Sequence, residues 1–183
     1  MALQTHFDFR SPTRIVHGPG SRTQLADFLS EEKPLIVTDK GLVRAGVVDS
    51  VLDVLTRAGI DFVLYDGALP NPPARCVHAG ERLYKKAQCT AIVAVGGGSP
   101  MDVAKMIGVV VGHGGRIERY LGANKVPGSI PPLYCLATTY GTGSEVTPFA
   151  VLTNPKTQNK DPVISWHIAV SYTHLTLPTM DSV

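Results

Sequence analysis

Cysteine is scarce in this sequence of 183 residues, where Cys76, Cys89 and Cys135 stand far apart and form no Cys-x-x-Cys pair. An odd number of distant cysteines argues against a disulfide framework and against a cysteine-based zinc site, and it is typical of free thiols in a reducing compartment. The first residues, MALQTHFDFRSP, also lack the basic stretch and apolar core of a signal peptide. We therefore expect a cytoplasmic protein.

Long apolar runs and an excess of charge of one sign are missing as well. The longest apolar run, around Val109–Val111, is short and bounded by glycine, whereas a membrane-spanning helix needs about 20 apolar residues. The chain has 17 Lys and Arg against 15 Asp and Glu, a net charge of +2, without a basic cluster. Neither a membrane nor a nucleic acid is therefore an expected partner. Hydrophobic residues make up 44% of the chain, which is enough for a folded core.

Short β-rich segments alternate with amphipathic segments along the chain. The predicted strands are residues 14–18, 34–39, 60–66, 91–95, 133–138 and 146–154. Between them apolar residues recur at helical spacing, for example at Val48, Val51 and Leu55. Apolar strands separated by helices are typical of a parallel sheet that is covered on both faces. The sequence thus predicts a doubly wound, Rossmann-like α/β domain with a mostly parallel sheet.

Three glycines, at positions 96–98, follow the predicted strand 91–95 and precede Ser99 and Pro100. Ligands of an open parallel sheet bind beyond the carboxyl ends of its strands, and residues without a Cβ let another group touch the backbone. Ser99 and Asp102 have the spacing of a capping box, which predicts a helix N-terminus with free N–H groups for a phosphate. A turn and a helix cap without any ligand explain this segment equally well when it is taken by itself.

A second predicted strand, 133–138, runs into the similar sequence TTYGTGSE. The hydroxyl side chains of this loop are those of Thr138, Thr139, Thr142 and Ser144. Two strand ends that are rich in backbone and hydroxyl donors suit a ligand with several phosphates.

Asp39 ends the predicted strand 34–39. A carboxylate at such a strand end can accept a hydrogen bond from a ribose hydroxyl, and it repels a 2′-phosphate. A helix cap or a turn before Lys40 is at least as common an explanation. The glycine turn also follows a later strand and not the first, which differs from the ordinary Rossmann fingerprint.

A resemblance to a known family is carried by the segments GGGSPMDVAK, PNP and TTYGTGSEVTPFAVLTNPKTQNK. From about Phe7 to Ala169 the chain resembles the iron-containing (group III) alcohol dehydrogenases, relatives of glycerol dehydrogenase and dehydroquinate synthase. The resemblance implies an N-terminal α/β domain like that of dehydroquinate synthase, which binds NAD(P), and a C-terminal helical domain that holds Fe²⁺ or Zn²⁺ and is absent here. The implied reaction is hydride transfer between NAD and an alcohol or aldehyde, in a protein that forms homo-oligomers at full length. Two alternatives stay open: a non-catalytic nucleotide-binding fragment, and a dehydroquinate-synthase-like or glycerol(-phosphate) dehydrogenase relative.

The resemblance also implies roles for individual residues. Those expected to meet the pyrophosphate and the neighbouring ribose are Gly97, Gly98, Ser99 and Asp102. Those expected to line the second loop are Thr138, Thr139, Thr142 and Ser144. Val151 would lie on the nicotinamide side, Lys160 would reach a ribose, and Asn71 would lie near the adenosine half. Asp39 would favour NAD over NADP. For Lys160, a solvated surface lysine is the alternative.

The resemblance ends before the C-terminus. In residues 170–183 the stretch SYTHLTLPTMDSV matches nothing expected of the family, so we predict a cofactor-binding domain over 1–169 and an unrelated tail after it. The metal ligands that the family implies, an aspartate and several histidines, would lie beyond this point. The six histidines of the chain include no pair at i, i+3 or i, i+4 spacing. We therefore expect neither metal ligands nor catalytic residues in this chain.

Overall fold

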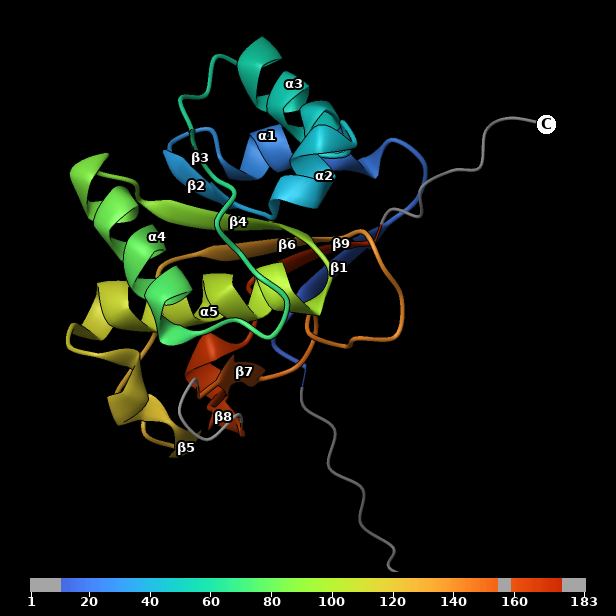
Figure 1. Ribbon diagram of the computed structural model, residues 1–183. Coiled ribbons are helices and arrows are strands. Elements are labelled where there is room, and N and C mark those ends of the chain that lie inside the picture. Colours follow the sequence, from blue (N-terminus) through green and yellow to red (C-terminus); the bar gives the residue numbers. More distant parts are fainter. Residues whose placement is uncertain (1–10, 155–158, 176–183) are drawn as a thin grey trace, which may run out of the picture.

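The chain folds around one parallel six-stranded sheet, seen in a computed structural model that describes residues 11–154 and 159–175 (Figure 1). In spatial order its strands are β1 (Arg14–His17), β9 (Tyr172–Leu175), β6 (Leu133–Ala137), β4 (Ala91–Gly96), β2 (Pro34–Val37) and β3 (Val63–Tyr65). The start of the family resemblance at Phe7 and residues 176–183 of the predicted tail lie outside the described residues.

Helices cover both faces of this sheet (Figure 1). One face carries α1 (Leu25–Phe28), α2 (Lys40–Arg44) and α3 (Asp49–Arg57), and the other carries α4 (Ala74–Lys86) and α5 (Gly98–His113). The short 3₁₀ helices are η1 (Ser21–Gln24), η2 (Ile117–Tyr120) and η3 (Trp166–Ile168). Along β4, Ile92 and Ala94 join the core under α4 and α5, whereas Val93 and Val95 join the core under α1 and α3. The predicted doubly wound α/β fold is confirmed, and burial on both faces explains why β4 is apolar throughout.

A second, smaller sheet departs from the predicted single sheet. It consists of β5 (Gly122–Ala123), β8 (Lys160–Ile164) and β7 (Phe149–Thr153), and β7 and β8 pair in antiparallel fashion. The predicted strand 146–154 therefore begins later, at Phe149, and does not join the main sheet. Parallel neighbours need a long crossover, usually a helix. No helix lies in the loop between β6 and β7 (residues 138–148), so β7 forms a hairpin with β8 beside α5.

Strand β9 lies within the segment that we predicted as an unrelated tail. It is inserted between β1 and β6, and it pairs in parallel with both. Thr173 is fully buried, and its hydroxyl donates to the carbonyl of Glu145. The main sheet thus continues past residue 169. That residues 170–183 are unrelated to the family stays a prediction.

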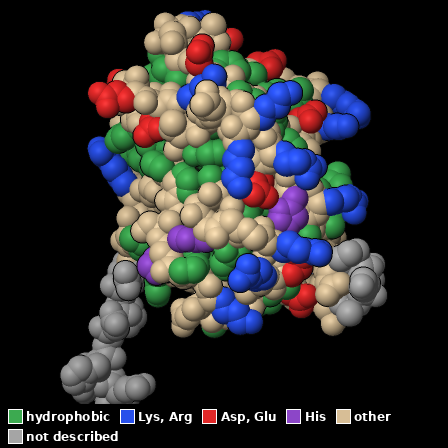
Figure 2. Space-filling view, turned by 90° about the vertical axis from the view of Figure 1, so that its left-hand side faces the viewer, with side chains coloured by type: hydrophobic (Ala, Val, Ile, Leu, Met, Phe, Trp, Pro, Cys, Tyr) green, Lys and Arg blue, Asp and Glu red, His purple; other side chains and the backbone are tan. Residues whose placement is uncertain are grey.

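The face formed by α4 and η2 shows Lys, Arg and His side chains with acidic side chains among them (Figure 2). Lys85 contacts Glu81 at 2.7 Å, one helical turn away, and Arg116 contacts Glu118 at 2.9 Å. Ion pairs at the surface contribute little to stability. Within the described ranges, the structure contains no helix that is long and apolar enough to cross a membrane.

Candidate functional site

The glycine turn between β4 and α5 is shaped by close backbone contacts. Gly96 has a φ of 149°, and a Cβ there would lie 2.7 Å from Cγ of Pro100. A Cβ on Gly97 would lie 2.6 Å from Oγ1 of Thr139 in the next strand-end loop. Both positions therefore require glycine, and the two predicted loops meet at the carboxyl ends of β4 and β6.

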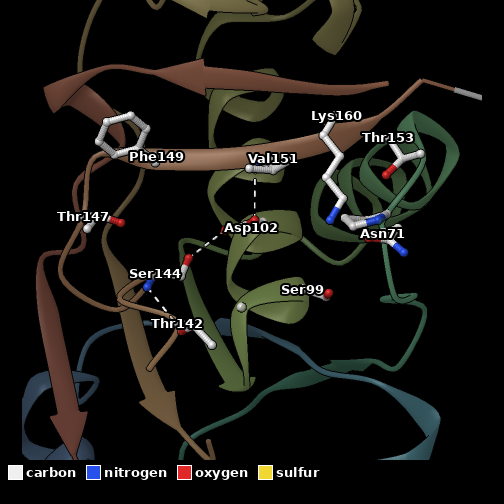
Figure 3. A pocket seen from close by; sticks show the side chains of 12 residues that line it. Asn71, Ser99, Asp102, Thr142, Ser144, Thr147, Phe149, Val151, Thr153 and Lys160 are labelled. Carbon is white, nitrogen blue, oxygen red and sulfur yellow. Dashed lines mark hydrogen bonds between the residues drawn. The ribbon is translucent and has the colours of Figure 1, made fainter. Parts of the chain in front are cut away.

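The predicted capping box of Ser99 and Asp102 is wrong. Helix α5 begins at Gly98, Gly97 is its N-cap, and no side chain caps it. The Asp102 carboxylate instead accepts hydrogen bonds from Oγ of Ser144 at 2.6 Å and from the N–H of Val151 at 3.1 Å (Figure 3). Burial raises the pKa of the Asp102 carboxyl above its ordinary value. Asp102 thus ties α5 to the loop after β6 and to β7, and the first N–H groups of α5 have no side-chain cap.

The second loop, residues 138–148, contains no helix. Oγ1 of Thr142 donates to Oε2 of Glu145 at 3.1 Å. The same atom accepts from the N–H of Ser144 at 3.3 Å (Figure 3). The side chains of Thr142 and Glu145 are therefore paired within a turn, and the chain then continues into β7. Thr142 and Ser144 shape the loop and do not start a helix.

Two cavities open beyond the carboxyl ends of the strands. The larger, which we call the Asp39 cavity, has a volume of ≈ 600 Å³ and is lined by Asp39, Lys40, Gly41, Leu42, Ala68, Leu69, Pro70, Gly97, Gly98, Ser99, Pro100, Thr138 and Thr139. The smaller, the Val151 cavity, has a volume of ≈ 290 Å³ and is lined by Asn71, Pro72, Gly98, Ser99, Asp102, Thr142, Ser144, Thr147, Phe149, Val151, Thr153 and Lys160 (Figure 3). The two share Gly98 and Ser99, the first residues of α5.

Every residue predicted to bind the cofactor lines one of these cavities. Asp39, Gly97, Thr138 and Thr139 lie in the first, and Asn71, Asp102, Thr142, Ser144, Val151 and Lys160 lie in the second. Whether they contact a cofactor stays a prediction. Asn71 shares its cavity with Val151 and Lys160 and not with Asp39, and its placement near the adenosine half stays a prediction. The Lys160 side chain points toward Asn71 across that cavity (Figure 3).

Asp39 has the helix-cap role that the sequence left open. Its Oδ1 accepts from the N–H of Leu42 at 3.0 Å, and Asp39 is the N-cap of α2. The same residue lines the Asp39 cavity. The cap is therefore confirmed, and a contact with a ribose stays a prediction.

Lys105 was missed by the sequence analysis. Its side chain is fully buried, and its Nζ donates to the carbonyls of Thr147 and Phe149 at 2.7 Å each and to Oγ of Ser144 at 3.4 Å. Burial lowers the pKa of the Lys105 ammonium below its ordinary value. A sequence signal did exist, since Lys105 interrupts the apolar run of α5 one turn after Asp102.

Among the described residues, no three or more His, Cys, Asp or Glu side chains gather in a way that could hold a metal ion. The side chains of this part of the chain therefore do not fit the iron or zinc that the resemblance implies for the complete family fold.

Comparison with known proteins decides between the possible families. The sequence profile described as iron-containing alcohol dehydrogenase matches residues 12–173. The chain belongs to this family. Choline dehydrogenase from Bacillus subtilis (strain 168) is 44% identical to this chain over 179 residues, which are 92% of the chain and 44% of the relative.

Solved structures of other proteins share the fold. A 1,3-propanediol oxidoreductase superposes with a TM-score of 0.87 at 38% identity, over 92% of this chain and 45% of that protein. A sulfoacetaldehyde reductase from Bifidobacterium kashiwanohense, solved in complex with NAD⁺, gives a TM-score of 0.84 at 31% identity, over 93% of this chain and 46% of that protein. The chain spans less than half the length of the relatives that it matches.

Proposed function

We propose that this chain is the cofactor-binding part of an NAD-dependent alcohol dehydrogenase, in which hydride passes between NAD and a small alcohol or aldehyde. One observation carries the proposal. The Asp39 cavity and the Val151 cavity meet at Gly98 and Ser99, at the N-terminus of a 16-residue helix. A dinucleotide has the same layout, with two bulky halves joined by a pyrophosphate, and a helix N-terminus favours that anion.

The side chains present fit a dinucleotide. A Cβ on Gly97 would lie 2.6 Å from Oγ1 of Thr139, so a side chain at this position would fill the narrow space between the glycine turn and the second loop. Oγ1 of Thr138, on the wall of the Asp39 cavity, is buried without a hydrogen-bond partner among the described residues. A ligand or a water molecule bound in the cavity would provide the missing hydrogen-bond partner.

The two cavities divide the work of holding the cofactor. In the Asp39 cavity, Asp39 accepts from the adenosine ribose and disfavours a 2′-phosphate. In the Val151 cavity, Val151 and Phe149 provide an apolar wall for the nicotinamide, and Lys160 lies within reach of the adjoining ribose. Bound NAD supplies the hydride acceptor, and the protein orients it and excludes water from one side of it.

The class of substrate is proposed from the names of the relatives. The proteins compared above are named for choline, 1,3-propanediol and sulfoacetaldehyde, which share an alcohol or aldehyde group and little else. We therefore assign a small alcohol or aldehyde as a class. A cytoplasmic location and a homo-oligomer at full length complete the proposal. For these 183 residues by themselves, nucleotide binding without turnover is the second candidate, since the described side chains form no metal-binding group.

A titration of NADH fluorescence tests the proposal with a matched pair of variants in α5. A Cβ on Gly98 and a Cβ on Gly112 would each meet their nearest neighbour at 3.5 Å, an ordinary contact. Gly98 lies between the two cavities and Gly112 lies near the other end of the helix. We expect Gly98→Ala to weaken NADH binding about tenfold, which corresponds to about 1.4 kcal/mol, and Gly112→Ala to leave it unchanged. Equal affinities in the two variants would place the cofactor elsewhere.

A further inference from the structure

Lys105 is a buried cation whose donors are all used. Its side chain is completely buried on α5, and an ammonium has three N–H donors. The structure provides three acceptors for them, the carbonyls of Thr147 and Phe149 and the hydroxyl of Ser144. Burying a charge costs several kcal/mol unless such partners are in place.

All three acceptors belong to one short segment, residues 144–149, that leads from the second glycine loop into β7. Ser144, Thr147 and Phe149 also line the Val151 cavity, whereas Lys105 does not. The lysine therefore holds this wall of the cavity from behind and has no access to its contents.

Asp102, one turn earlier on α5, holds the same segment from the cavity side. The Ser144 hydroxyl has one proton, which it donates to Asp102, so its oxygen is free to accept from Lys105. The second carboxylate oxygen of Asp102 accepts from the N–H of Val151, which fixes the next part of the wall. One hydroxyl thus links an anion and a cation of the same helix to the loop that both of them hold.

Stability by itself is a poor explanation for this arrangement. Replacing a buried ionic group by a well-packed apolar side chain is often neutral or stabilising, and the rest of the core-facing surface of α5 is apolar. Directed hydrogen bonds from a rigid helix to the carbonyls of Thr147 and Phe149, in contrast, define where the loop backbone lies.

We propose that Lys105 is a positioning residue for the nicotinamide side of the cofactor site. It sets the path of residues 144–149, and thereby the shape of the Val151 cavity, and it leaves the Asp39 cavity untouched. This inference rests on the proposed function for its ligand, because the two cavities are taken to hold the two halves of NAD.

The test compares NADH with ADP on the 183-residue chain and on Lys105→Met, which has a similar length and no donors. ADP carries the adenosine and the pyrophosphate, so it uses the Asp39 cavity and the start of α5. We expect Lys105→Met to weaken NADH binding about tenfold while ADP affinity, measured by calorimetry, changes less than about twofold. Hydrogen exchange should accelerate in residues 144–151 and stay unchanged in β4. Loss of structure in general would instead weaken both ligands together.

Ile107→Ala is the matched control, because Ile107 lies on another side of the same helix, against Gly80 of α4. It should lower the free energy of unfolding and leave the ratio of NADH to ADP affinity unchanged. If Lys105→Met does not fold, Lys105→Gln, whose side chain is uncharged and one atom shorter than that of lysine, replaces it with the same expected split. An unaltered chain that binds neither ligand would refute the proposed function. A chain that binds both, with the same affinity ratio and exchange pattern in the Lys105 variant, would refute the role of Lys105.

Discussion

Gly97 and Thr139 touch so closely that the glycine has no room for a side chain: a Cβ at position 97 would lie 2.6 Å from Oγ1 of the threonine. The two residues come from different strand-end loops, 42 positions apart in the sequence. Their contact joins the glycine turn after β4 to the hydroxyl-rich loop after β6, and the Asp39 cavity lies against both.

The contact predicts a destabilised Gly97→Ala variant that a second substitution rescues. The backbone of Gly97 has φ −89° and ψ −157°, which alanine adopts without strain, so the cost comes from overpacking against Thr139. We expect the free energy of unfolding in urea to fall by about 1–3 kcal/mol. In the background of Thr139→Ala, where the nearest remaining atom of residue 139 is 3.7 Å away, most of this loss should disappear. Equal losses in both backgrounds would contradict the contact.

Asp39→Asn separates the two roles of Asp39. Asparagine caps a helix as well as aspartate does, so the hydrogen bond from the N–H of Leu42 and the stability of the fold should survive. Removing the negative charge should narrow the preference for NADH over NADPH, because the 2′-phosphate is no longer repelled. Fluorescence titrations with both cofactors measure the ratio. If the unaltered protein binds the two equally, Asp39 has no part in cofactor choice.

The raised pKa of Tyr65 predicts that the protein loses stability at high pH. Its hydroxyl donates to the Cys76 carbonyl at 2.7 Å, and burial, followed by the nearby Cys76 and Asp66, raises the pKa of Tyr65 from 10.0 to about 12. Because the folded-state pKa lies above the unfolded one, the contribution of the phenol is complete below pH 10 and is lost as the pH rises through about 12. The free energy of unfolding should therefore decrease across this window.

Tyr65→Phe should make that alkaline decrease shallower. At pH 8 the variant should be less stable by about 1 kcal/mol, since the Cys76 carbonyl loses its donor. Tyr140→Phe is the control, because the Tyr140 side chain is 72% exposed and its substitution should not change stability at pH 8. Urea unfolding at a series of pH values provides both numbers, and an unchanged alkaline slope in Tyr65→Phe would contradict the assignment.

The isolated chain should bind nucleotide without turning over an alcohol. Within the described residues no His, Cys, Asp and Glu side chains group as a metal site, so we expect no stoichiometric iron or zinc after purification and no NADH formation with 1,3-propanediol or ethanol. Elemental analysis and absorbance at the NADH band test both statements. Turnover that a chelator abolishes would contradict them.

The sequence by itself determined the local features of this protein. The glycine turn, the hydroxyl-rich loop and the apolar strands were all predicted correctly in type, because the missing Cβ atoms and the apolar runs act within a few residues. The candidate site followed from these features, since the carboxyl ends of neighbouring parallel strands β4 and β6 meet at one edge of the sheet.

The tertiary structure decided how the polar side chains pair. The sequence predicts Asp102 as part of a helix cap and assigns no role to Lys105, yet both side chains contact the loop after β6. Their partners lie 39 to 49 residues away in the sequence, so the spacing of neighbouring residues cannot predict these pairs. Local spacing also does not show that β7 lies outside the main sheet or that β9 lies between β1 and β6. Local sequence sets the backbone preference of each segment, whereas burial of a charge is stable only where distant segments supply its hydrogen-bond partners.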